Sequence, residues 1–373
     1  MIYLDHNATS PIDPRVFESM EPYLKTFYGN PSSAHRLGRA SRTAIETARE
    51  QIAQLVNAEA SQVVFTSGGT EANNLALLGA FSDNSKHILY GATEHPSVVD
   101  PLKNLAQKNV EVEAIAVDND GRISLEQLNS QLKTNTGLIS IMHANNETGV
   151  IQDIQSLRHG LNNDQAIFHV DAVQSAGKTQ VDFARMGAHL MTLSSHKVYG
   201  PKGVGALISD KSIQLNPLMY GGGQESSLRP GTENVAAIVG FGKAAELASL
   251  ELEQRRQQLL ALQNQLEQRL RTIPGLSIVA ERADRLVNTT QVIIDGMDGE
   301  MMLMMMDRQG ICISGGSACS SRVLKPSPVL IAMGYNASQS LSAIRISLGV
   351  QNTSDEVDRF CETLKGIVAS YRS

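Results

Sequence analysis

Lys197 lies in a segment whose residue types are suited to covalent chemistry. The apolar run 190–193 gives way there to two serines, a histidine and the lysine. Gly200, Pro201 and Gly203 follow at once, which disfavours a helix and places Lys197 on a tight connection at a strand end. Burial at such a place lowers the pKa of a lysine amine and makes it a nucleophile able to form a Schiff base. A single lysine is more often a solvated side chain, so the hypothesis depends on what the other strands bring nearby.

Four other expected strands also end in residues that could hold a ligand. Gly69 and Thr70 follow the run 63–66, where glycine lets the backbone approach a ligand and a helix N-terminus offers N–H groups to a phosphate. By itself this pattern is also that of an ordinary tight turn. His95 follows the strand that ends near Gly91, just before a proline that can occupy a first helical turn.

The remaining two strand ends carry amides and a carboxylate. The pair Asn145-Asn146 follows the run 138–143, and Asp171 ends the run 166–170. An unpaired carboxylate is costly where a strand is buried on both faces, so Asp171 needs a cationic partner such as a protonated pyridinium nitrogen. Ligands of open α/β sheets bind beyond the carboxyl ends of the strands. The five strand ends together predict a pyridoxal-phosphate site with Lys197 as its attachment point.

The order of the elements predicts an α/β fold. Short apolar runs alternate with helical patterns between residues 63 and 170, which is typical of βαβ units in a mainly parallel sheet covered on both faces. Two more strands, 190–194 and 204–209, follow without room for a helix between them. They are expected to form an antiparallel pair at one side of a seven-stranded sheet.

A change of pattern after the glycine cluster 221–223 indicates a second, smaller domain. A long helical pattern over 235–271 leads into short strands and a closing helix, which is the arrangement of an α+β domain. We place the large domain at 14–250 and the small domain at 1–13 together with 251–373.

Composition limits the classes of function. The 373 residues are 42% hydrophobic and 19% charged, as in a soluble globular protein, and the net charge of −6 argues against direct nucleic-acid binding. The sequence has no run of eighteen apolar residues and its N-terminus does not resemble a signal peptide, so no membrane span is expected. Three cysteines give no disulfide framework, which suits the cytoplasm. The methionine-rich run 301–306 is expected to pack in a core, and no metal site is predicted.

Several long motifs resemble those of the cysteine desulfurases, in the class V aminotransferase group of fold-type-I pyridoxal-phosphate enzymes. The resemblance covers nearly the whole chain, with the motifs in the family's order. These motifs are Tyr3-Leu4-Asp5-His6-Asn7-Ala8-Thr9, Ser67-Gly68-Gly69-Thr70-Glu71, Thr93-Glu94-His95, Asn145-Asn146-Glu147-Thr148-Gly149, His169-Val170-Asp171-Ala172-Val173-Gln174-Ser175, Ser195-His196-Lys197-Val198-Tyr199-Gly200-Pro201-Lys202-Gly203, Ser314-Gly315-Gly316-Ser317-Ala318-Cys319-Ser320-Ser321 and Ile344-Arg345-Ile346-Ser347-Leu348-Gly349.

The resemblance implies a role for each residue around the cofactor. Lys197 would hold pyridoxal phosphate and later move protons at the α-carbon of the substrate. His95 would stack on the ring and assist proton transfer. Asp171 would keep the pyridinium nitrogen protonated, and Gln174 would hydrogen-bond the phenolic oxygen. The phosphate would be held by Gly69, Thr70, Ser194 and His196.

The resemblance also implies a substrate site and a second subunit. Asn146, which also lies beside the cofactor, and Arg345 would hold the substrate carboxylate, for which arginine offers a two-point grip. Thr232 would reach the phosphate bound by a neighbouring subunit, so a homodimer is expected.

The three cysteines differ in context. Cys312 lies in a short apolar strand and Cys361 in the amphipathic C-terminal helix, so both are expected to be buried and structural. Cys319 lies in a loop, about 315–327, that is rich in glycine and serine and offers the access that a thiolate nucleophile needs. The resemblance makes Cys319 the thiolate that takes the sulfur of L-cysteine, leaving alanine and an enzyme persulfide. An acceptor protein for iron–sulfur cluster assembly or tRNA thiolation would then receive the sulfur.

Other functions stay open at this point. A selenocysteine lyase or an aminotransferase would use the same cofactor, although a cysteine in a mobile loop speaks against an aminotransferase. A binding or scaffold protein could keep the fold without catalysis. The joint presence of Lys197, Asp171, His95, Cys319 and Arg345 argues against that alternative.

Overall fold

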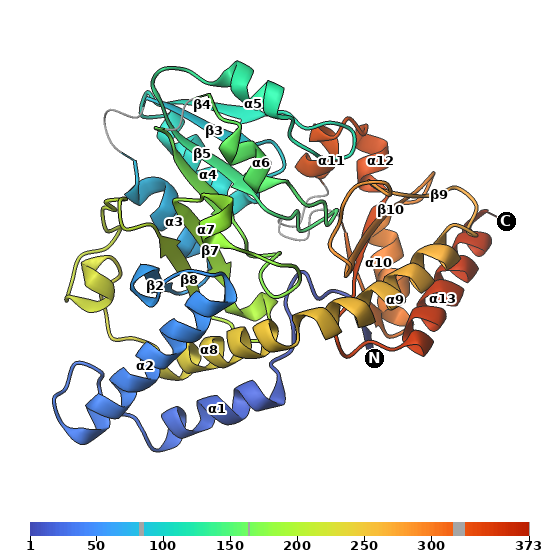
Figure 1. Cartoon of the computed structure of the whole chain (residues 1–373). Coiled ribbons are helices and arrows are strands. Elements are labelled where there is room, and N and C mark those ends of the chain that lie inside the picture. The colour runs from blue at the N-terminus through green and yellow to red at the C-terminus, as the bar shows by residue number, and fades with distance from the viewer. Residues whose placement is uncertain (82–85, 163–164, 316–324, 373) are drawn as a thin grey trace.

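The computed structural model describes residues 1–81, 86–162, 165–315 and 325–372, so Cys319 lies outside the described residues. The chain forms a larger part around a seven-stranded sheet and a smaller part around a four-stranded sheet, which lie beside each other in Figure 1. The closing helix and both chain ends belong to the smaller part (Figure 1).

The seven-stranded sheet has the order β2-β8-β7-β6-β5-β3-β4. Its strands are β2 (Val63–Thr66), β3 (His87–Gly91), β4 (Glu111–Ile115), β5 (Thr136–Met142), β6 (Ile167–Asp171), β7 (Leu190–Ser194) and β8 (Gly205–Ser209). The strands β4, β3, β5, β6 and β7 pair in parallel, while β8 is antiparallel to both β7 and β2. The predicted α/β fold is therefore confirmed. The predicted pair β7–β8 is also present, and β2 lies outside it as an edge strand.

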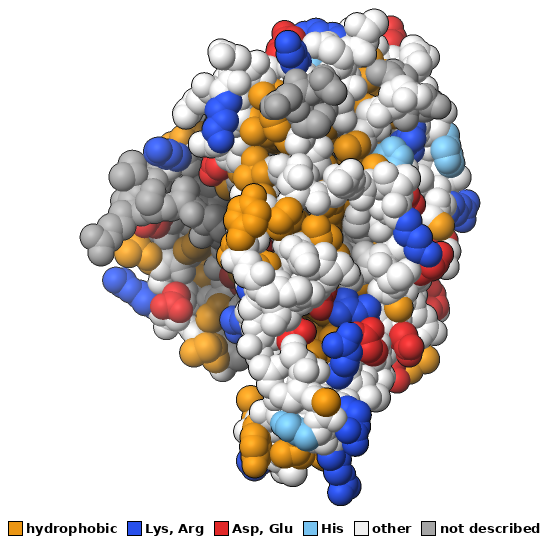
Figure 2. Space-filling model, turned by 90° about the vertical axis from the view of Figure 1, so that its left-hand side faces the viewer, with side chains coloured by type: hydrophobic (Ala, Val, Ile, Leu, Met, Phe, Trp, Pro, Cys, Tyr) orange, Lys and Arg blue, Asp and Glu red, His pale blue; other side chains and the backbone are white. Residues whose placement is uncertain are grey.

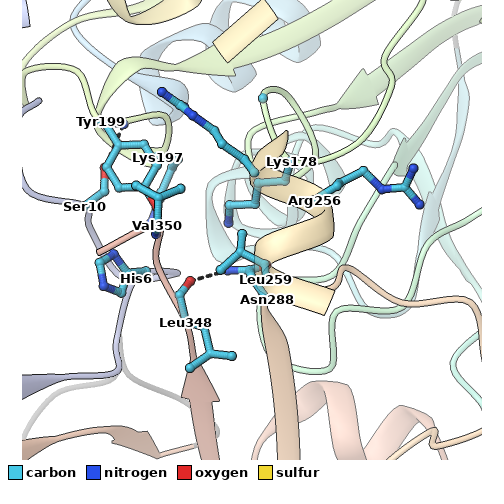
Figure 3. A pocket seen from close by; sticks show the side chains of 12 residues that line it. His6, Ser10, Lys178, Lys197, Tyr199, Arg256, Leu259, Asn288, Leu348 and Val350 are labelled. Carbon is cyan, nitrogen blue, oxygen red and sulfur yellow. Dashed lines mark hydrogen bonds between the residues drawn. The ribbon is translucent and has the colours of Figure 1, made fainter. Parts of the chain in front are cut away.

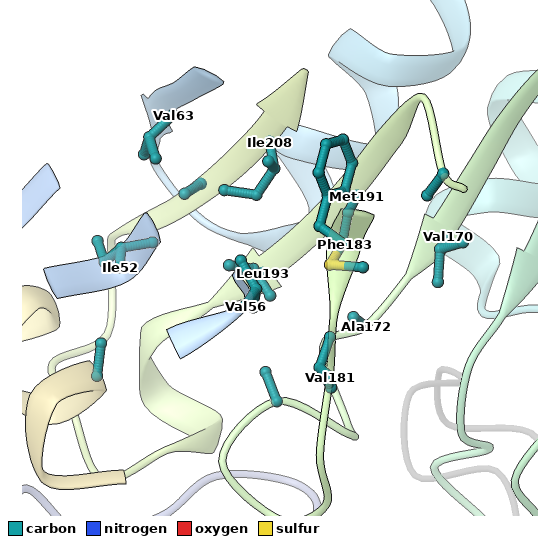
Figure 4. Packing of buried hydrophobic residues seen from close by; sticks show 14 of the residues in the cluster. Ile52, Val56, Val63, Val170, Ala172, Val181, Phe183, Met191, Leu193 and Ile208 are labelled. Atoms are coloured by element: carbon teal, nitrogen blue, oxygen red, sulfur yellow. The ribbon is translucent and has the colours of Figure 1, made fainter. Parts of the chain in front are cut away.

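Helices cover both faces of this sheet. They are α1 (Pro14–Lys25), α2 (Arg36–Leu55), α3 (Gly69–Gly79), α4 (Pro96–Ala106), α5 (Leu125–Gln131), α6 (Ile154–His159), α7 (Phe183–Met186) and α8 (Val235–Leu250). Successive residues of a strand point to opposite faces, so Val63 packs with the cluster that includes α2 and α8, whereas Val64 packs with α3 and α4. Figure 4 shows Ile52 of α2 beside Val63 and Leu193 on the first of these faces.

The four-stranded sheet of the smaller part is wholly antiparallel, in the order β12-β13-β10-β9. Its strands are β9 (Leu276–Ile278), β10 (Thr289–Ile294), β12 (Ser314–Gly315) and β13 (Ala343–Ser347), and its helices are α9 (Leu252–Leu270), α10 (Gly299–Arg308), α11 (Pro328–Ala332), α12 (Ala337–Leu341) and α13 (Ser354–Arg372). Two methionines of the predicted core run, Met302 and Met306, are buried there, but Met304 is 59% exposed. The expectation that the methionine run 301–306 packs in a core is therefore confirmed for only some of its residues.

The two parts are connected twice. The expected helix 235–271 is in fact two helices, α8 and α9, which meet at Glu251 where the chain passes from one part to the other (Figure 1). At the other end of the chain, β1 (Ile2–Tyr3) pairs in parallel with β11 (Ile311–Cys312). Residues from β1 and from α9 onward share one hydrophobic cluster. The limits of the two domains stay a prediction.

One expectation about the cysteines is wrong. Cys361 is buried, as expected, but Cys312 is partly exposed because β11 is only two residues long and pairs only with the equally short β1 among the described strands. Among the helices that the structure describes, none is long and apolar enough to cross a membrane.

Candidate active site

Lys197 ends a short 3-10 turn, Ser195–Lys197, that follows β7 directly. The predicted tight connection at a strand end is present. A β-carbon on Gly200 would lie 2.1 Å from Ser195 Oγ, which explains why the chain needs a glycine there. The Lys197 amine donates hydrogen bonds to the backbone oxygens of Asn7, at 2.6 Å, and Ala8, at 2.7 Å. The lysine is thus held against the N-terminal segment.

Asp171, at the end of β6, is 6% exposed and its carboxylate is fully engaged. Its Oδ1 accepts the backbone N–H of Val173 at 2.9 Å, and its Oδ2 accepts Asn73 Nδ2 at 2.8 Å. These donors fix the orientation of a carboxylate that is largely out of water. Asn73 lies in α3, four residues after Gly69, and no motif in the sequence points to this role.

His95 is joined to Asp171 by a chain of hydrogen bonds. Its Nδ1 lies 2.8 Å from Ser97 Oγ, which in turn accepts Asn73 Nδ2 at 2.8 Å. His95 also caps α4, accepting the backbone N–H of Ser97 at 3.1 Å. Burial lowers the pKa of His95, and the nearby charge of Lys197 acts in the same direction. The ring is therefore neutral at physiological pH, in a fixed position beside Asp171.

A cradle suited to an anion lies at the N-terminus of α3. Gly69 opens this helix, and a β-carbon there would lie 3.0 Å from a methyl group of Val173 and 3.4 Å from Ser194 Cβ. Ser194 Oγ is buried and has no hydrogen-bond partner among the described residues. A close-approach glycine, an orphaned hydroxyl and a helix N-terminus are the parts of a phosphate site. Thr70, the next residue of the helix, is exposed.

His196 lies beside Lys197 on the same connection. Its Nδ1 is 3.1 Å from the hydroxyl of Thr9, and burial followed by the charges of Lys197 and Lys202 lowers its pKa to about 4. A neutral imidazole can still donate one hydrogen bond to an anion.

Asn7 connects the predicted residues of both parts. Its backbone oxygen accepts both Lys197 Nζ and Gln174 Nε2, the latter at 3.0 Å. Its side-chain nitrogen donates to the backbone oxygen of Asn146, at 3.1 Å, and to the hydroxyl of Thr289, at 2.8 Å. Asn7 was part of a recognised motif, but only the folded chain shows this bridging contact.

Arg345 comes from the centre of β13 in the small sheet and is 2% exposed. It donates to Asp5 Oδ1 at 2.6 Å and to the backbone oxygen of Asn146 at 3.0 Å. Its Nε is buried without a partner among the described residues. The guanidinium therefore contacts both Asn146 and Asp5. Contact with Asn146 is what the two residues need if they are to bind one substrate carboxylate together.

Glu147 is a buried acid whose role is not evident from the sequence. Its Oε2 accepts the hydroxyl hydrogen of Ser327 at 2.6 Å. Burial raises its pKa to about 7, although Ser327 and the charge of Arg345 pull the other way. Ser327 follows the segment that contains Cys319, so the described contact fixes the chain at the end of that segment.

Thr232 is the exception among the described site residues. It is exposed, and no hydrogen bond or ion pair within the described chain joins it to the other predicted residues. The loop before it is held by Glu225, which pairs with Arg49 at 2.7 Å, and by Arg229, which pairs with Glu71 of α3 at 3.0 Å. The described contacts therefore bring the loop near the start of α3 but do not join Thr232 to the cradle at Gly69.

The residues present fit pyridoxal phosphate. The orphaned Ser194 hydroxyl and the tight approach at Gly69 suit a phosphate, and the oriented carboxylate of Asp171 suits a cationic ring nitrogen. The amine of Lys197 lies close enough to His95 for its charge to lower the pKa of the imidazole. A bound aldehyde cofactor of that shape would use each of these groups.

Comparisons with known proteins agree with this fit. The aminotransferase class-V family model matches residues 2–360. The chain is 42% identical to cysteine desulfurase IscS 1 of Archaeoglobus fulgidus, with 100% of this chain and 98% of that protein covered. It is 41% identical to cysteine desulfurase IscS of Vibrio vulnificus, and the match covers 100% of this chain and 93% of that protein.

Solved structures give the same result. A NifS-like protein superimposes with a TM-score of 0.93 at 34% identity, covering 99% of both chains. A structure described as SspA in complex with cysteine superimposes with a TM-score of 0.84 at 33% identity, covering 95% of this chain and 100% of that one. The chain therefore belongs to the class-V aminotransferase family of pyridoxal-phosphate-dependent enzymes and, within it, to the cysteine desulfurases.

Proposed function

We propose that this enzyme removes sulfur from L-cysteine, with Lys197 holding pyridoxal phosphate and Cys319 receiving the sulfur. The observation that carries the proposal is the grouping of the cradle at Gly69, the oriented carboxylate of Asp171 and the amine of Lys197 at adjoining strand ends. The family resemblance supports Cys319, which lies outside the described residues.

The cofactor, when bound, supplies an electron-withdrawing ring conjugated to the α-carbon of the substrate. We infer that Asp171 pairs with the ring nitrogen and that His95 covers the ring, because hydrogen bonds already fix both side chains. Gln174 would offer its amide nitrogen to the phenolic oxygen. The phosphate would be held by Gly69, Thr70, Ser194 and His196.

The substrate carboxylate would bind between Asn146 and Arg345. Arg345 already touches the backbone of Asn146, and its unpartnered Nε leaves one donor for a ligand. A two-point contact would require one guanidinium nitrogen to share or leave Asp5. Binding would thus orient the substrate at the junction of the two sheets, with Lys197 placed to move a proton at its α-carbon.

The sulfur step would transfer one sulfur atom between thiols. The Cys319 thiolate attacks the substrate sulfur, the substrate C–S bond breaks, and its electron pair returns to the substrate carbon, which is then protonated. The balance is L-cysteine plus enzyme thiol giving L-alanine plus enzyme persulfide. A loop cysteine suits this task because the persulfide must then reach an acceptor.

We further propose a homodimer, because the family resemblance assigns Thr232 to the phosphate of a neighbouring subunit and no described contact joins it to the cradle of its own chain. Large exposed apolar residues support this proposal. Figure 2 shows hydrophobic side chains gathered across the face that carries the loop before Thr232, and Tyr220 in that loop is 89% exposed. Leu218 and Met219, next to it, are 38% and 45% exposed.

The acceptor would be an iron–sulfur scaffold or a tRNA-thiolation enzyme, as the names of the IscS relatives and the persulfide chemistry suggest. We propose a cytoplasmic location because a thiol carrier must stay reduced, and Cys312 and Cys361 form no disulfide within the described chain. The proposed domain division, 14–250 against 1–13 with 251–373, is supported by the separate hydrophobic clusters of the two sheets.

The test is to incubate the purified protein with pyridoxal phosphate and L-cysteine and to measure sulfide and alanine. We expect both products, loss of the cofactor absorbance band in Lys197→Ala, and an intact band without sulfide in Cys319→Ser. Full turnover by Cys319→Ser would rule out the persulfide route. Release of a keto acid without sulfide would indicate an aminotransferase, and a faster reaction with selenocysteine would indicate a selenocysteine lyase.

A further inference from the structure

The small cavity beside Lys197, which Lys178 also lines in Figure 3, belongs to the active site already described. A separate cluster of potential metal ligands lies at the opposite edge of the same sheet, where the parallel strands begin. It consists of His87, the first residue of β3, and of Glu111 and Glu113 in β4. The active-site residues follow the carboxyl ends of the strands, so this cluster takes no part in the proposed reaction.

Strand pairing brings the three side chains together, although they are distant in the sequence. β3 and β4 pair in parallel, with His87 opposite Glu111 and Leu89 opposite Glu113. Side chains two positions apart on a strand point to the same face, so both carboxylates project from the face that carries His87. One ligand atom of each residue lies within 4.8 Å of the others. β4 is the outermost described strand of the sheet, and both carboxylates are accessible to solvent (Figure 1).

His87 is held in the orientation that a metal-binding histidine needs. Its side chain is fully buried, and its Nδ1 lies 2.7 Å from the hydroxyl oxygen of Thr136 in β5. Its Nε2 is also buried but has no hydrogen-bond partner among the described residues. This nitrogen faces Glu113 Oε1 at 3.5 Å, which is too long for a hydrogen bond. A histidine ligand is usually held by a hydrogen bond at one ring nitrogen, which leaves the other nitrogen for the metal.

Lys133 supplies the positive charge that the two carboxylates need in the present arrangement. Its amine pairs with Glu111 Oε1 at 2.7 Å and also with Glu113. The lysine side chain is 37% exposed, so it can turn into solvent at little cost. The amine leaves His87 Nε2 unpaired, and burial lowers the pKa of that histidine, so its ring is neutral at pH 7.5. A divalent cation in place of the amine would bind the carboxylates and the imidazole together.

The distances suit a small transition-metal ion. Zinc binds histidine nitrogen and carboxylate oxygen at about 2.1 Å, so two ligand atoms of a tetrahedral site lie about 3.4 Å apart. His87 Nε2 and Glu113 Oε1 already have nearly this separation, at 3.5 Å. The exposed side chain of Glu111 would need to move by no more than about 1.4 Å to match it, given the 4.8 Å limit on the cluster. A nitrogen ligand favours zinc or cobalt over magnesium or calcium, which prefer oxygen alone.

We propose that His87, Glu111 and Glu113 form a binding site for a divalent transition-metal ion such as Zn²⁺. The ion takes the place of the Lys133 amine and binds His87 Nε2 with one oxygen from each carboxylate, and water completes the coordination. It links β3 to β4 and stabilises this edge of the sheet. The site is independent of Lys197 and of the reaction proposed above.

The experiment measures zinc binding to the cofactor-loaded full chain by equilibrium dialysis at pH 7.5. Cys319→Ser is the background, because it removes a loop thiol that could also bind zinc. We expect one zinc ion per chain at this site, with an affinity at least about tenfold weaker in Glu113→Gln, which loses a charged ligand. Glu126→Gln, the matched control, removes an exposed carboxylate of α5 outside the cluster and should bind as the background does. Lys133→Gln should bind about fivefold more tightly, because it removes the competing cation.

Thermal unfolding gives a second readout. Zinc should raise the unfolding midpoint of the background protein and of Lys133→Gln, but not that of Glu113→Gln. The substituted side chains are partly or fully exposed, so the variants are expected to fold. Equal zinc binding by Glu113→Gln and Glu126→Gln would overturn the proposal. Weaker binding by Lys133→Gln would do the same, because the lysine would then help to build the site rather than compete for it.

Discussion

At the scale of single residues, the site is defined by how buried polar groups are oriented. Asp171 accepts one donor from Asn73 and one from the backbone of Val173, and Asn73 also binds the serine that fixes His95. A carboxylate and an imidazole held in this way need no rearrangement when a cationic ring arrives, which is the condition for electrostatic preorganisation.

The buried Glu147 makes a prediction about pH. Its pKa of about 7 lies above the usual 4.5, so the native state keeps a proton that the unfolded chain has lost between these values. Stability therefore falls as pH rises through this window, by about 3 kcal/mol at most, and the loss is complete above pH 7. Glu147→Gln, which resembles the protonated acid, should be more stable than the wild type at pH 8 and equal to it at pH 4.5 in urea unfolding.

The control for this prediction is Glu18→Gln, at an exposed position on α1. It should leave the difference between the two pH values unchanged. An equal effect of Glu147→Gln at both pH values would contradict the assignment of a protonated, buried carboxyl.

At the scale of elements, the N-terminal segment that follows β1 positions Lys197 against the small sheet. Asn7 and Ala8 accept the lysine amine, while the backbone N–H of Asn7 donates to Ser347 Oγ at 3.0 Å. His6, in the same segment, packs against Gly349, where a β-carbon would lie 2.1 Å from the imidazole. The segment therefore has little freedom to move without disturbing Lys197.

Gly349→Ala should consequently displace His6 and lower stability by about 1–3 kcal/mol, because the new methyl group has no room. Uptake of pyridoxal phosphate should become slower in the same variant. The matched control is Gly366→Ala in α13, where no described atom beyond the neighbouring helix backbone lies within 4 Å of the added β-carbon and helix propensity should add about 0.5–1 kcal/mol. Thermal unfolding of both variants checks the pair, and an unchanged midpoint for Gly349→Ala would refute the packing argument.

The sequence predicted the elements better than the contacts between them. Strand–helix alternation and the rule that parallel strands end at one edge were enough to place Lys197, Asp171 and His95 near one another. The roles of Asn73 and Asn7 could not be read in this way, since one looks like an ordinary helix residue and the other acts only after the N-terminus folds back. Cys312 was misjudged because the apolar residues around it suggested burial, whereas β11 forms only a short two-stranded sheet with β1 among the described strands.

At the scale of the whole molecule, the candidate site is a junction. The large sheet supplies Lys197 and Asp171, the small sheet supplies Arg345, and the N-terminal segment bonds to both. The exposed apolar side chains of Leu218, Met219 and Tyr220, in the loop before Thr232, are consistent with the proposed second subunit. If the substrate binds as proposed, between Asn146 and Arg345, neither part alone could hold it.

The most direct test of the central claim is to identify the lysine that carries the cofactor. Incubation with pyridoxal phosphate, borohydride reduction and peptide mass spectrometry would locate the attached group. We predict one modified peptide, which contains Lys197, with Lys178 unmodified although its amine also binds Asn7. Attachment at Lys178, or no specific attachment at all, would contradict the assignment of Lys197.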